Sequence, residues 1–409
     1  MKRACGLDFA GNLPQFGPMA KASTLSAPTL KLRGGARHRV LQGHPWVFAN
    51  EIADGFLLGK PFDGQGIELR DASGRSLGMG LYNSRSQIIW RRYSRGLDAF
   101  DALWLRERIQ ASISRRNDTR FCRLVWSEAD GLPGLVIDRF DDVLVVQLLT
   151  FGMDRQATVI GEALQEFLAP REILFRNDAP SRALEGLDLK VTTHSGKPVA
   201  ADWFTIDGIE YRLDLHAGQK TGFYLDQRAQ HPLVASYASG RRVLDGCCNQ
   251  GAFALHCARS GAASVLGIDS AKPAIEAALE NAARNALEAE FLHANLFDWF
   301  NANRAARFDL IVLDPPSFAR NRRVVEGALR GYKELNLRAF QQLETGGILA
   351  TYCCSQHVDA ATFESIVAEA AGDAGREPRL LHRTEAPADH PVLLTMPESR
   401  YLKGLILEV

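Results

Sequence analysis

Two adjacent cysteines, Cys353 and Cys354, end the apolar run ILATYCC where a buried strand reaches the surface. A cysteine thiolate is a soft nucleophile, and it is more available at the mouth of a sheet than in a core. Methylation of cytosine at C5 needs such a group, because attack at C6 makes C5 electron-rich. Free cysteine is also among the most buried residue types, so a structural role remains the alternative. Strand side chains alternate between faces, so both cysteines can face one pocket only if the strand has already ended.

The segment DPPSF, residues 314–318, follows the apolar run FDLIVL. Its two prolines fix an extended backbone, because each locks φ and lacks an N–H donor. Such a wall can orient a flat base beside a cofactor, which makes Pro315, Pro316 and Phe318 candidate substrate-binding residues. Asp314 is a candidate catalytic and cofactor-binding residue, since its carboxyl group could stabilise charge at N3 of a cytosine. A plain turn from strand to loop is the alternative.

A cofactor site is predicted where RRVLD ends at Asp245 and a loop leads through Gly251 into a helix. The next strand, VLGID, ends at Asp269, which could accept hydrogen bonds from both hydroxyls of a ribose or cap a helix. The GxGxxG pattern of a pyrophosphate-binding loop is missing. These features favour a nucleoside cofactor without a pyrophosphate, namely S-adenosylmethionine (SAM).

The segment GQKTGFYLDQR, residues 218–228, combines flexible glycine with aromatic and charged side chains directly before this region. It is interpreted as a cofactor lid, with a solvated loop as the alternative. The candidate cofactor-binding residues in it are Lys220, Phe223, Tyr224, Asp226 and Arg228.

Three units must position these residues. Residues 31–100 alternate short apolar runs with turn residues, which predicts a small β-rich domain. Residues 101–212 read as α+β, with amphipathic helices over 101–116 and 154–168. Residues 213–409 alternate strand and helix, which predicts an open parallel sheet covered by helices and closed by a terminal hairpin over 391–409. Residues 1–30 are expected to be a flexible extension.

The charge distribution indicates one basic region in a neutral chain. The net charge is +0, but residues 31–100 hold eleven Lys or Arg against six Asp or Glu. A local excess of this kind can bind phosphates. Arg91, Arg92 and Arg95, in RRYSR, are therefore candidate contacts to an RNA backbone, with an ordinary solvated surface as the alternative.

The remaining composition limits the class of protein. Seven cysteines without a CxxC pair favour neither a disulfide framework nor a zinc site, and they suit a reducing cytoplasm. No metal site is expected. No apolar run has the length of a membrane span, and the N-terminus lacks the apolar core of a secretion signal, so no membrane partner is expected.

Several long segments in order resemble the bacterial class I 23S rRNA cytosine-5 methyltransferases that join a PUA domain to a SAM-binding domain. They are HPWVFANEI, SEADGLPGLVIDRF, GQKTGFYLDQR, DPPSF, RGYKELN, GGILATYCCS and ADHPV…YLKG. The resemblance covers nearly everything after residue 31. It implies a PUA-like RNA-binding domain, a central α+β domain and a Rossmann-like methyltransferase domain. The implied partner is 23S rRNA, and a second copy of the chain is kept as a candidate partner.

The resemblance also assigns individual residues. The family's S-C-S motif places the nucleophile on Cys354 and leaves Cys353 as a structural neighbour. Three departures stand out. The first loop reads GCCNQG where the family reads like C-F-S-Y-T-G. Asn295, a candidate cofactor contact, replaces an acid near the adenine. Ser317 stands where other RNA cytosine-5 methyltransferases carry a second cysteine.

Three functions follow in order. The first is SAM-dependent methylation of C5 of a cytosine in 23S rRNA through a cysteine–C6 adduct. The second is methylation of an exocyclic amine such as guanine N2, which needs no cysteine. The third is a non-catalytic RNA-binding assembly factor with a degenerate SAM site, which the altered first loop keeps open.

Overall fold

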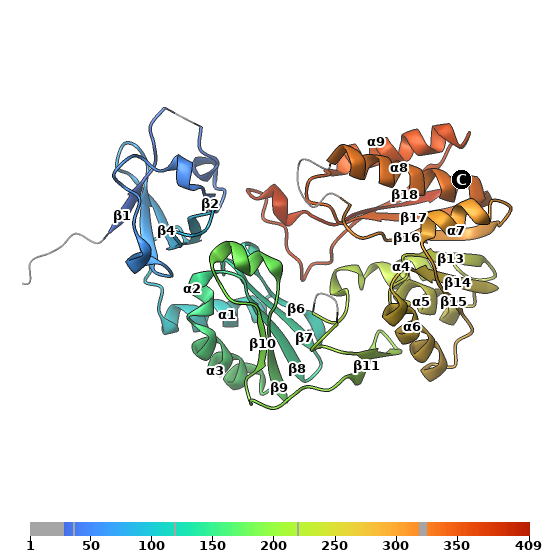
Figure 1. Cartoon of the computed structure of the whole chain (residues 1–409), viewed down its shortest axis with the longest axis horizontal. Helices are drawn as coiled ribbons and strands as arrows, with labels where there is room; N and C mark the ends of the chain where they lie inside the picture. The colour runs from blue at the N-terminus through green and yellow to red at the C-terminus, as the bar shows by residue number, and fades with distance from the viewer. Residues whose placement is uncertain (1–27, 36, 118–119, 219–220, 319–324) are drawn as a thin grey trace, which may run out of the picture.

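The computed structural model describes residues 28–35, 37–117, 120–218, 221–318 and 325–409. Most of the expected N-terminal extension therefore lies outside the described residues. Two small sheets and a hairpin precede one large sheet, and the elements run in order from one end of the molecule to the other (Figure 1).

The first sheet is small and antiparallel apart from one edge strand. Its order is β1-β3-β4-β5-β2. Trp90 fills the core, with its indole N–H donating to Ile67 O at 2.8 Å. Gly80 is required beside it, because a Cβ there would lie 2.3 Å from the indole. The strands are β1 (Thr29–Lys31), β2 (Trp46–Val47), β3 (Gly66–Arg70), β4 (Ser76–Tyr82) and β5 (Trp90–Ser94).

The central sheet has the order β10-β9-β8-β7-β6 and carries helices. The helix predicted over 101–116 is α1, which begins after Asp101, whose carboxylate accepts from Trp104 N at 2.9 Å. The helix predicted over 154–168 is α3, which follows a single turn, α2. The elements are α1 (Ala102–Ser114), β6 (Phe121–Trp126), β7 (Leu135–Phe140), β8 (Val143–Leu148), α2 (Phe151–Asp154), α3 (Ala157–Leu168), β9 (Glu172–Asn177) and β10 (Lys190–Thr193).

A hairpin, β11 (Asp202–Ile206) and β12 (Ile209–Leu213), leads into a seven-stranded sheet of order β15-β14-β13-β16-β17-β19-β18. Its first five strands are parallel, as predicted. They are β13 (Arg242–Gly246), β14 (Ser264–Asp269), β15 (Glu290–His293), β16 (Phe308–Leu313) and β17 (Leu343–Cys353); β18 (Arg379–Glu385) and β19 (Lys403–Glu408) are antiparallel.

Helices cover both faces of this sheet (Figure 1). Alternate strand residues face the two layers: Val243 belongs to one core and Leu244 to the other. One layer is α4 (Gln230–Ala235), α5 (Ala252–Arg259) and α6 (Lys272–Arg284); the other is α7 (Leu296–Ala302), α8 (Val325–Gln342) and α9 (Ala360–Asp373). The prediction of a Rossmann-like sheet after a β-rich unit and an α+β unit is confirmed.

The predicted terminal hairpin is wrong. Residues 391–396 form no strand; β19 instead pairs with β17 on one side and β18 on the other. The reason is that β18, RLLHRTE, is a polar and largely exposed edge strand without clear alternation of apolar residues. The chain between β18 and β19 reaches back toward the first sheet, where Glu398 accepts from Arg39 at 2.7 Å (Figure 1).

The central sheet is joined to the large sheet by a buried ion pair. Arg123 of β6 donates to both carboxylate oxygens of Asp138 at 2.7 and 2.8 Å, and Thr221 donates to Asp138 at 2.7 Å. The backbone N–H of Arg123 also donates to Asp389 at 2.9 Å. Removing one partner of a buried pair leaves an uncompensated charge, which costs far more than the pair itself contributes.

Arg123→Met should therefore lower the free energy of unfolding by about 3–5 kcal/mol. Arg120→Met is the matched control, because Arg120 pairs with Asp141 at the surface and should cost less than about 1 kcal/mol. Urea denaturation followed by circular dichroism gives both values. Equal effects of the two substitutions would contradict the role assigned to the buried pair.

Candidate active site

The loop after β13 turns sharply into α5. Cys247 and Asn249 have φ values of 65° and 48°, and Gly251 has φ 83°. A Cβ on Gly251 would lie 2.9 Å from the ring of Phe291, so a larger residue would collide with β15. The sequence predicted this glycine for close approach to a ligand, and the structure adds packing against β15 as a second reason.

Asp245 is a fully buried carboxyl group at the carboxyl end of β13. One oxygen accepts from Ala254 N at 2.9 Å, and the other has no hydrogen-bond partner among the described residues. Burial, followed by the charges of Asp314 and Asp269, raises the pKa of Asp245 to about 8. A buried carboxyl oxygen without a partner at the mouth of a sheet suits a ligand that brings a donor or a positive charge.

Asp269 ends β14 and holds the neighbouring loop. Its two oxygens accept from Asn249 N at 2.9 Å and from Ala271 N at 2.8 Å. Each carboxylate oxygen has a second lone pair, so the group can also accept from two hydroxyls. Asn295, by contrast, is the N-cap of α7, and its side-chain oxygen accepts from the backbone N–H groups of Phe297 and Asp298.

The segment 221–228 contributes two side chains to the site. Gln227 is buried, and its amide donates to Asp314 at 3.0 Å. Burial, and then the charges of Asp314, Asp226, Cys354 and Asp269, raise the pKa of Tyr224. The Tyr224 phenol therefore lies among the acidic groups at the ends of β14 and β16 and beside the cysteine after β17.

Three other candidates in this segment hold it against the protein. Phe223 packs in the core against Tyr211, with ring centroids 5.0 Å apart. Asp226 accepts from Tyr401 at 2.7 Å. Arg228 forms an ion pair with Asp207 at the β11–β12 turn, 2.6 Å apart. Lys220 lies outside the described residues.

The adjacent cysteines have different surroundings. Cys353 is the last residue of β17 and is fully buried in the core under α8 and α9. Cys354 follows the strand and is partly exposed, and its thiol contacts Pro315 O at 3.8 Å. The strand thus ends between them, which directs Cys353 inward and brings Cys354 against DPPSF.

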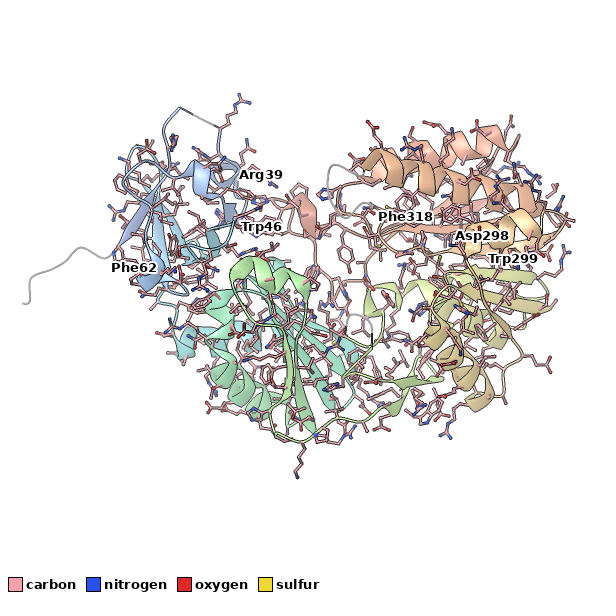
Figure 2. The ribbon with its side chains drawn as sticks, viewed as in Figure 1. Arg39, Trp46, Phe62, Asp298, Trp299 and Phe318 are labelled. Atoms are coloured by element: carbon pink, nitrogen blue, oxygen red, sulfur yellow. The ribbon has the colours of Figure 1, made fainter. Side chains whose placement is uncertain are left out.

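Phe318 and Ser317 lie on the far side of DPPSF. Phe318 packs on Tyr332 of α8, with ring centroids 4.8 Å apart, and against α7 (Figure 2). Ser317 and Tyr332 both hydrogen bond to Ser355 at 2.9 Å. Pro315 is buried, and Pro316 is exposed.

Sequence reasoning missed Lys403. It lies opposite Cys353 on β19, and its ammonium group donates to Ser355 O and Val358 O at 2.6 Å. Burial lowers the pKa of Lys403, although the nearby cysteines and Asp359 act in the opposite direction. It thereby holds the loop that begins at Cys354. The available signal was a lysine inside the apolar run YLKGLILEV.

The basic segment RRYSR differs from the sequence expectation. Arg91 is only 16% exposed and pairs with Glu128 at 3.0 Å and Glu185 at 3.3 Å. Burial, and then Arg95, lowers the pKa of Arg92 to about 10. Arg92 donates to Gly43 O, and only Arg95 is well exposed. A phosphate contact therefore does not fit Arg91, because protein carboxylates already hold its guanidinium group.

Two absences apply to the described part of the chain. It contains no cluster of three His, Cys, Asp or Glu side chains arranged to hold a metal ion. Within the same residues, no helix has both the length and the apolarity that crossing a bilayer requires.

Comparisons with known proteins place both ends of the chain. Residues 186–406 match the S-adenosylmethionine-dependent methyltransferase family, and residues 30–95 match a PUA-like domain. The chain is similar to "Ribosomal RNA large subunit methyltransferase I" of Shewanella denitrificans, with 38% identity over 93% of this chain and 99% of the relative. The protein of the same name from Serratia proteamaculans is 36% identical over the same shares.

Solved structures give the same fold. A SAM-dependent methyltransferase from Streptococcus mutans superposes with a TM-score of 0.79 at 19% identity, covering 93% of this chain and all of that one. A second methyltransferase, SMU.776, complexed with S-adenosylhomocysteine (SAH), gives 0.78 at 20% identity, covering 91% of this chain and 97% of that one.

Proposed function

The chain belongs to the SAM-dependent methyltransferases that carry a PUA-like domain and include ribosomal RNA large subunit methyltransferase I, and on this premise we propose that it methylates C5 of a cytosine in 23S rRNA. SAM is its cofactor and ribosomal RNA its substrate class. The reaction is placed in the cytoplasm, where reduced cysteines and ribosomal RNA occur together.

The position of Cys354 carries this proposal. Its thiol is the partly exposed sulfur beside DPPSF, whereas Cys353 is buried. An amine-methylating enzyme on the same fold needs no nucleophile there. A cysteine that leaves the strand toward an acid-Pro-Pro wall supports a reaction that passes through a covalent bond to the base.

The proposed reaction assigns a role to each group. The Cys354 thiolate adds to C6 of the cytosine, and a C–S bond forms. Asp314 stabilises the charge that develops at N3, while Pro315 and Pro316 border the base. C5 then takes the methyl group that SAM supplies. Loss of the C5 proton to a base and departure of the thiolate restore the aromatic ring and the free enzyme.

The cofactor residues fit a cation. The carboxyl groups of Asp245, Asp269 and Asp314 lie close enough to raise one another's pKa or that of Tyr224. SAM carries a positive sulfonium and an ammonium group, so a cluster of acids suits it. Asp245 has the unpaired oxygen for the ammonium group, Asp269 the lone pairs for a ribose, and Gly251 the close approach.

Mass spectrometry of nucleosides tests the reaction directly. Unmodified 23S rRNA incubated with SAM and the protein should yield 5-methylcytidine. A methylated guanine would favour the second candidate, which the acid-Pro-Pro segment also fits. Absence of both a product and SAM binding in calorimetry would favour the assembly factor, for which the altered loop at residues 246–250 is the supporting feature.

SAM binding should depend on pH through Asp245. Because the pKa of Asp245 is raised to about 8, its carboxyl group is mostly neutral at lower pH and must lose a proton to pair with a cation. Affinity for SAM should therefore rise with pH, by up to about tenfold per unit, and level off above about 8. Calorimetry at several pH values measures this slope. Asp245→Asn is the control, since it should remove the slope while the titration of SAM itself stays the same; an unchanged slope would contradict the assignment.

A further inference from the structure

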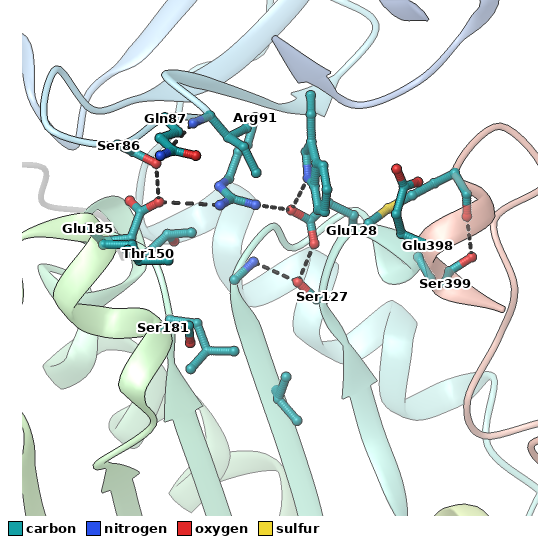
Figure 3. Close-up of a pocket in the computed structure, with 18 of the residues that line it drawn as sticks. Ser86, Gln87, Arg91, Ser127, Glu128, Thr150, Ser181, Glu185, Glu398 and Ser399 are labelled. Carbon is teal, nitrogen blue, oxygen red and sulfur yellow. Dashed lines mark hydrogen bonds and ion pairs between the residues drawn. The ribbon is translucent and has the colours of Figure 1, made fainter. Parts of the chain in front are cut away.

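A cavity of about 360 Å³ lies where three parts of the chain meet (Figure 3). The first sheet contributes Trp46 and Arg91, the central unit Trp126 and Glu128, and the segment before β19 contributes Met396. Its volume lies in the range of ligand pockets, about 300–1,000 Å³. The cavity is separate from the acids at the ends of β13, β14 and β16.

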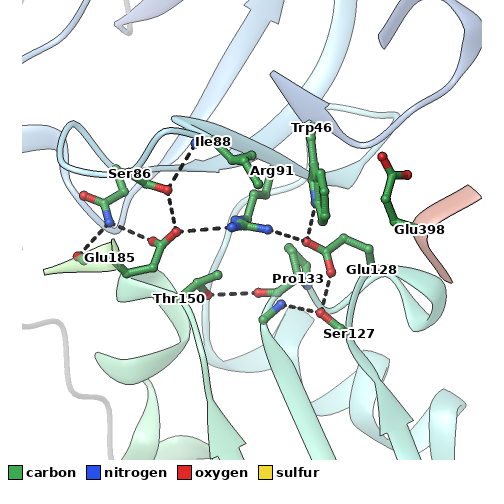
Figure 4. A network of polar contacts seen from close by, with 12 residues as sticks. Trp46, Ser86, Ile88, Arg91, Ser127, Glu128, Pro133, Thr150, Glu185 and Glu398 are labelled. Carbon is green, nitrogen blue, oxygen red and sulfur yellow. Dashed lines mark hydrogen bonds and ion pairs between the residues drawn. The ribbon is translucent and has the colours of Figure 1, made fainter. Parts of the chain in front are cut away.

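The floor of this cavity is a fixed polar network (Figure 4). Arg91 bridges Glu128 and Glu185, at 3.0 and 3.3 Å. Trp46 donates its indole N–H to Glu128 at 2.6 Å, and Ser86 donates to Glu185 at 2.6 Å. Every one of these side chains is held by a partner, so the floor is already formed before a ligand arrives.

The walls are aromatic and apolar. Arg91 covers Trp46 at 5.2 Å from the ring centroid, and Arg123 lies 4.5 Å from the ring of Trp126. Both rings nevertheless line the cavity, together with Met396 and Leu184, of which Leu184 is 66% exposed. Flat aromatic walls of this size suit a planar ring system.

The charges separate a base from a phosphate. Inside the cavity Glu128 and Glu185 place two negative charges against the single positive charge of Arg91. Burial would raise the pKa of Glu128, but Arg91 and hydrogen bonds from Ser127 and Trp46 outweigh it and lower the pKa. The floor therefore repels phosphate and favours a neutral ligand with N–H donors.

Positive charges lie at the rim instead. Arg85 is exposed and donates to Gly186 O, directly after Glu185, at 3.5 Å. Arg39 is 47% exposed and pairs with Glu398 beside Met396; Figure 2 shows Arg39 and Trp46 on the same edge of the first sheet. An acidic floor under a basic rim suits a nucleotide whose base enters while its phosphates remain outside.

The cavity is connected to the proposed catalytic loop by sequence. Gln356, two residues after Cys354, is one of its lining residues. A strand of RNA whose target base lies at Cys354 would therefore pass close to this opening. The PUA-like domain, which forms the opposite wall, would hold the same strand.

We propose that this cavity binds a second, unstacked nucleobase of the substrate RNA, one that bears an amino group and flanks the methylated base. The inference rests on the proposed function for its RNA, but the cavity itself does not take part in methyl transfer. A base bound here would fix the register of the RNA, because extrahelical bases are recognised by stacking and by hydrogen bonds to their edges.

Filling the cavity tests this inference. Ser181 and Ala183 are both exposed on the short helix Pro180–Glu185, but only Ser181 lines the cavity. Ser181→Trp should weaken binding of an unmodified 23S rRNA fragment about tenfold or more in fluorescence anisotropy, as expected for the loss of one stacked base. Ala183→Trp should bind like the wild type. SAM affinity and kcat at saturating RNA should stay unchanged in both.

Two further readouts distinguish a base from other contacts. The salt dependence of RNA binding should keep its slope in Ser181→Trp, because no phosphate contact is lost. In RNAs with single abasic sites, one position other than the target should weaken wild-type binding and have no further effect on Ser181→Trp.

Each outcome has a separate meaning. Equal RNA binding by Ser181→Trp and Ala183→Trp would overturn the inference, and so would a changed salt slope. If wild type binds RNA without methylating it and Ser181→Trp still binds less tightly, the proposed function fails and the base site stands. If wild type does not bind the RNA, both fail.

Discussion

Replacing Cys354 by alanine should abolish methyl transfer to RNA and leave SAM binding intact. The proposed mechanism has no route to an electron-rich C5 without the sulfur, so turnover should fall by about 10⁴-fold or more, as is usual when a covalent nucleophile is removed. The fold should tolerate the change, because Cys354 lies after the end of β17 and is partly exposed. Nucleoside mass spectrometry gives the product, and calorimetry gives the SAM affinity.

Cys353→Ala is the matched control, since it removes the same atoms one residue earlier. Cys353 is buried between β17 and the helices α8 and α9, so its loss should cost about 1 kcal/mol of stability and leave turnover at saturation close to that of the wild type. If Cys354→Ala forms as much product as the wild type, the sulfur has no covalent role, and the amine-methylating alternative gains support.

Local sequence patterns predicted the parts of this structure that depend on near neighbours. Parallel strands with alternating helices, the helix after Asp101 and the buried Cys353 beside an exposed Cys354 all follow from periodicity, capping and strand ends. Gly251 was predicted from its place after a strand. In each case the physical cause lies within a few residues of the feature.

The sequence could not predict features that depend on distant partners. Arg91 and Phe223 have the right composition for RNA and cofactor contacts, but carboxylates 37 and 94 residues away and a buried tyrosine already occupy them. Asn295 is used as a helix cap. Lys403 contacts the loop after Cys354 only because β19 inserts beside β17, a pairing that the polar edge strand β18 concealed.

Asp314→Asn should reduce kcat by about 10²–10⁴-fold, the usual contribution of a positioned acid or base. The substitution keeps a side-chain oxygen that can still accept from Gln227, so the segment 221–228 should stay in place. It removes the negative charge that would stabilise N3 of the base. Affinity for SAM should change much less than kcat, because Asp245 and Asp269 keep their carboxyl groups. Asp309→Asn is the control at the opposite end of β16, where Asp309 pairs with Arg242 at 3.0 Å; its kcat should match the wild type.

The two active-site substitutions together decide the reaction class. An acid beside the target base serves both cytosine C5 and guanine N2 chemistry, so a low kcat for Asp314→Asn alone is compatible with either. Only the C5 reaction also requires the sulfur of Cys354. Loss of activity in both variants therefore supports C5 methylation, and loss in Asp314→Asn alone supports amine methylation. Retained activity in Asp314→Asn would remove Asp314 from either mechanism, because no other acid among the described residues follows β16 next to the Pro-Pro wall.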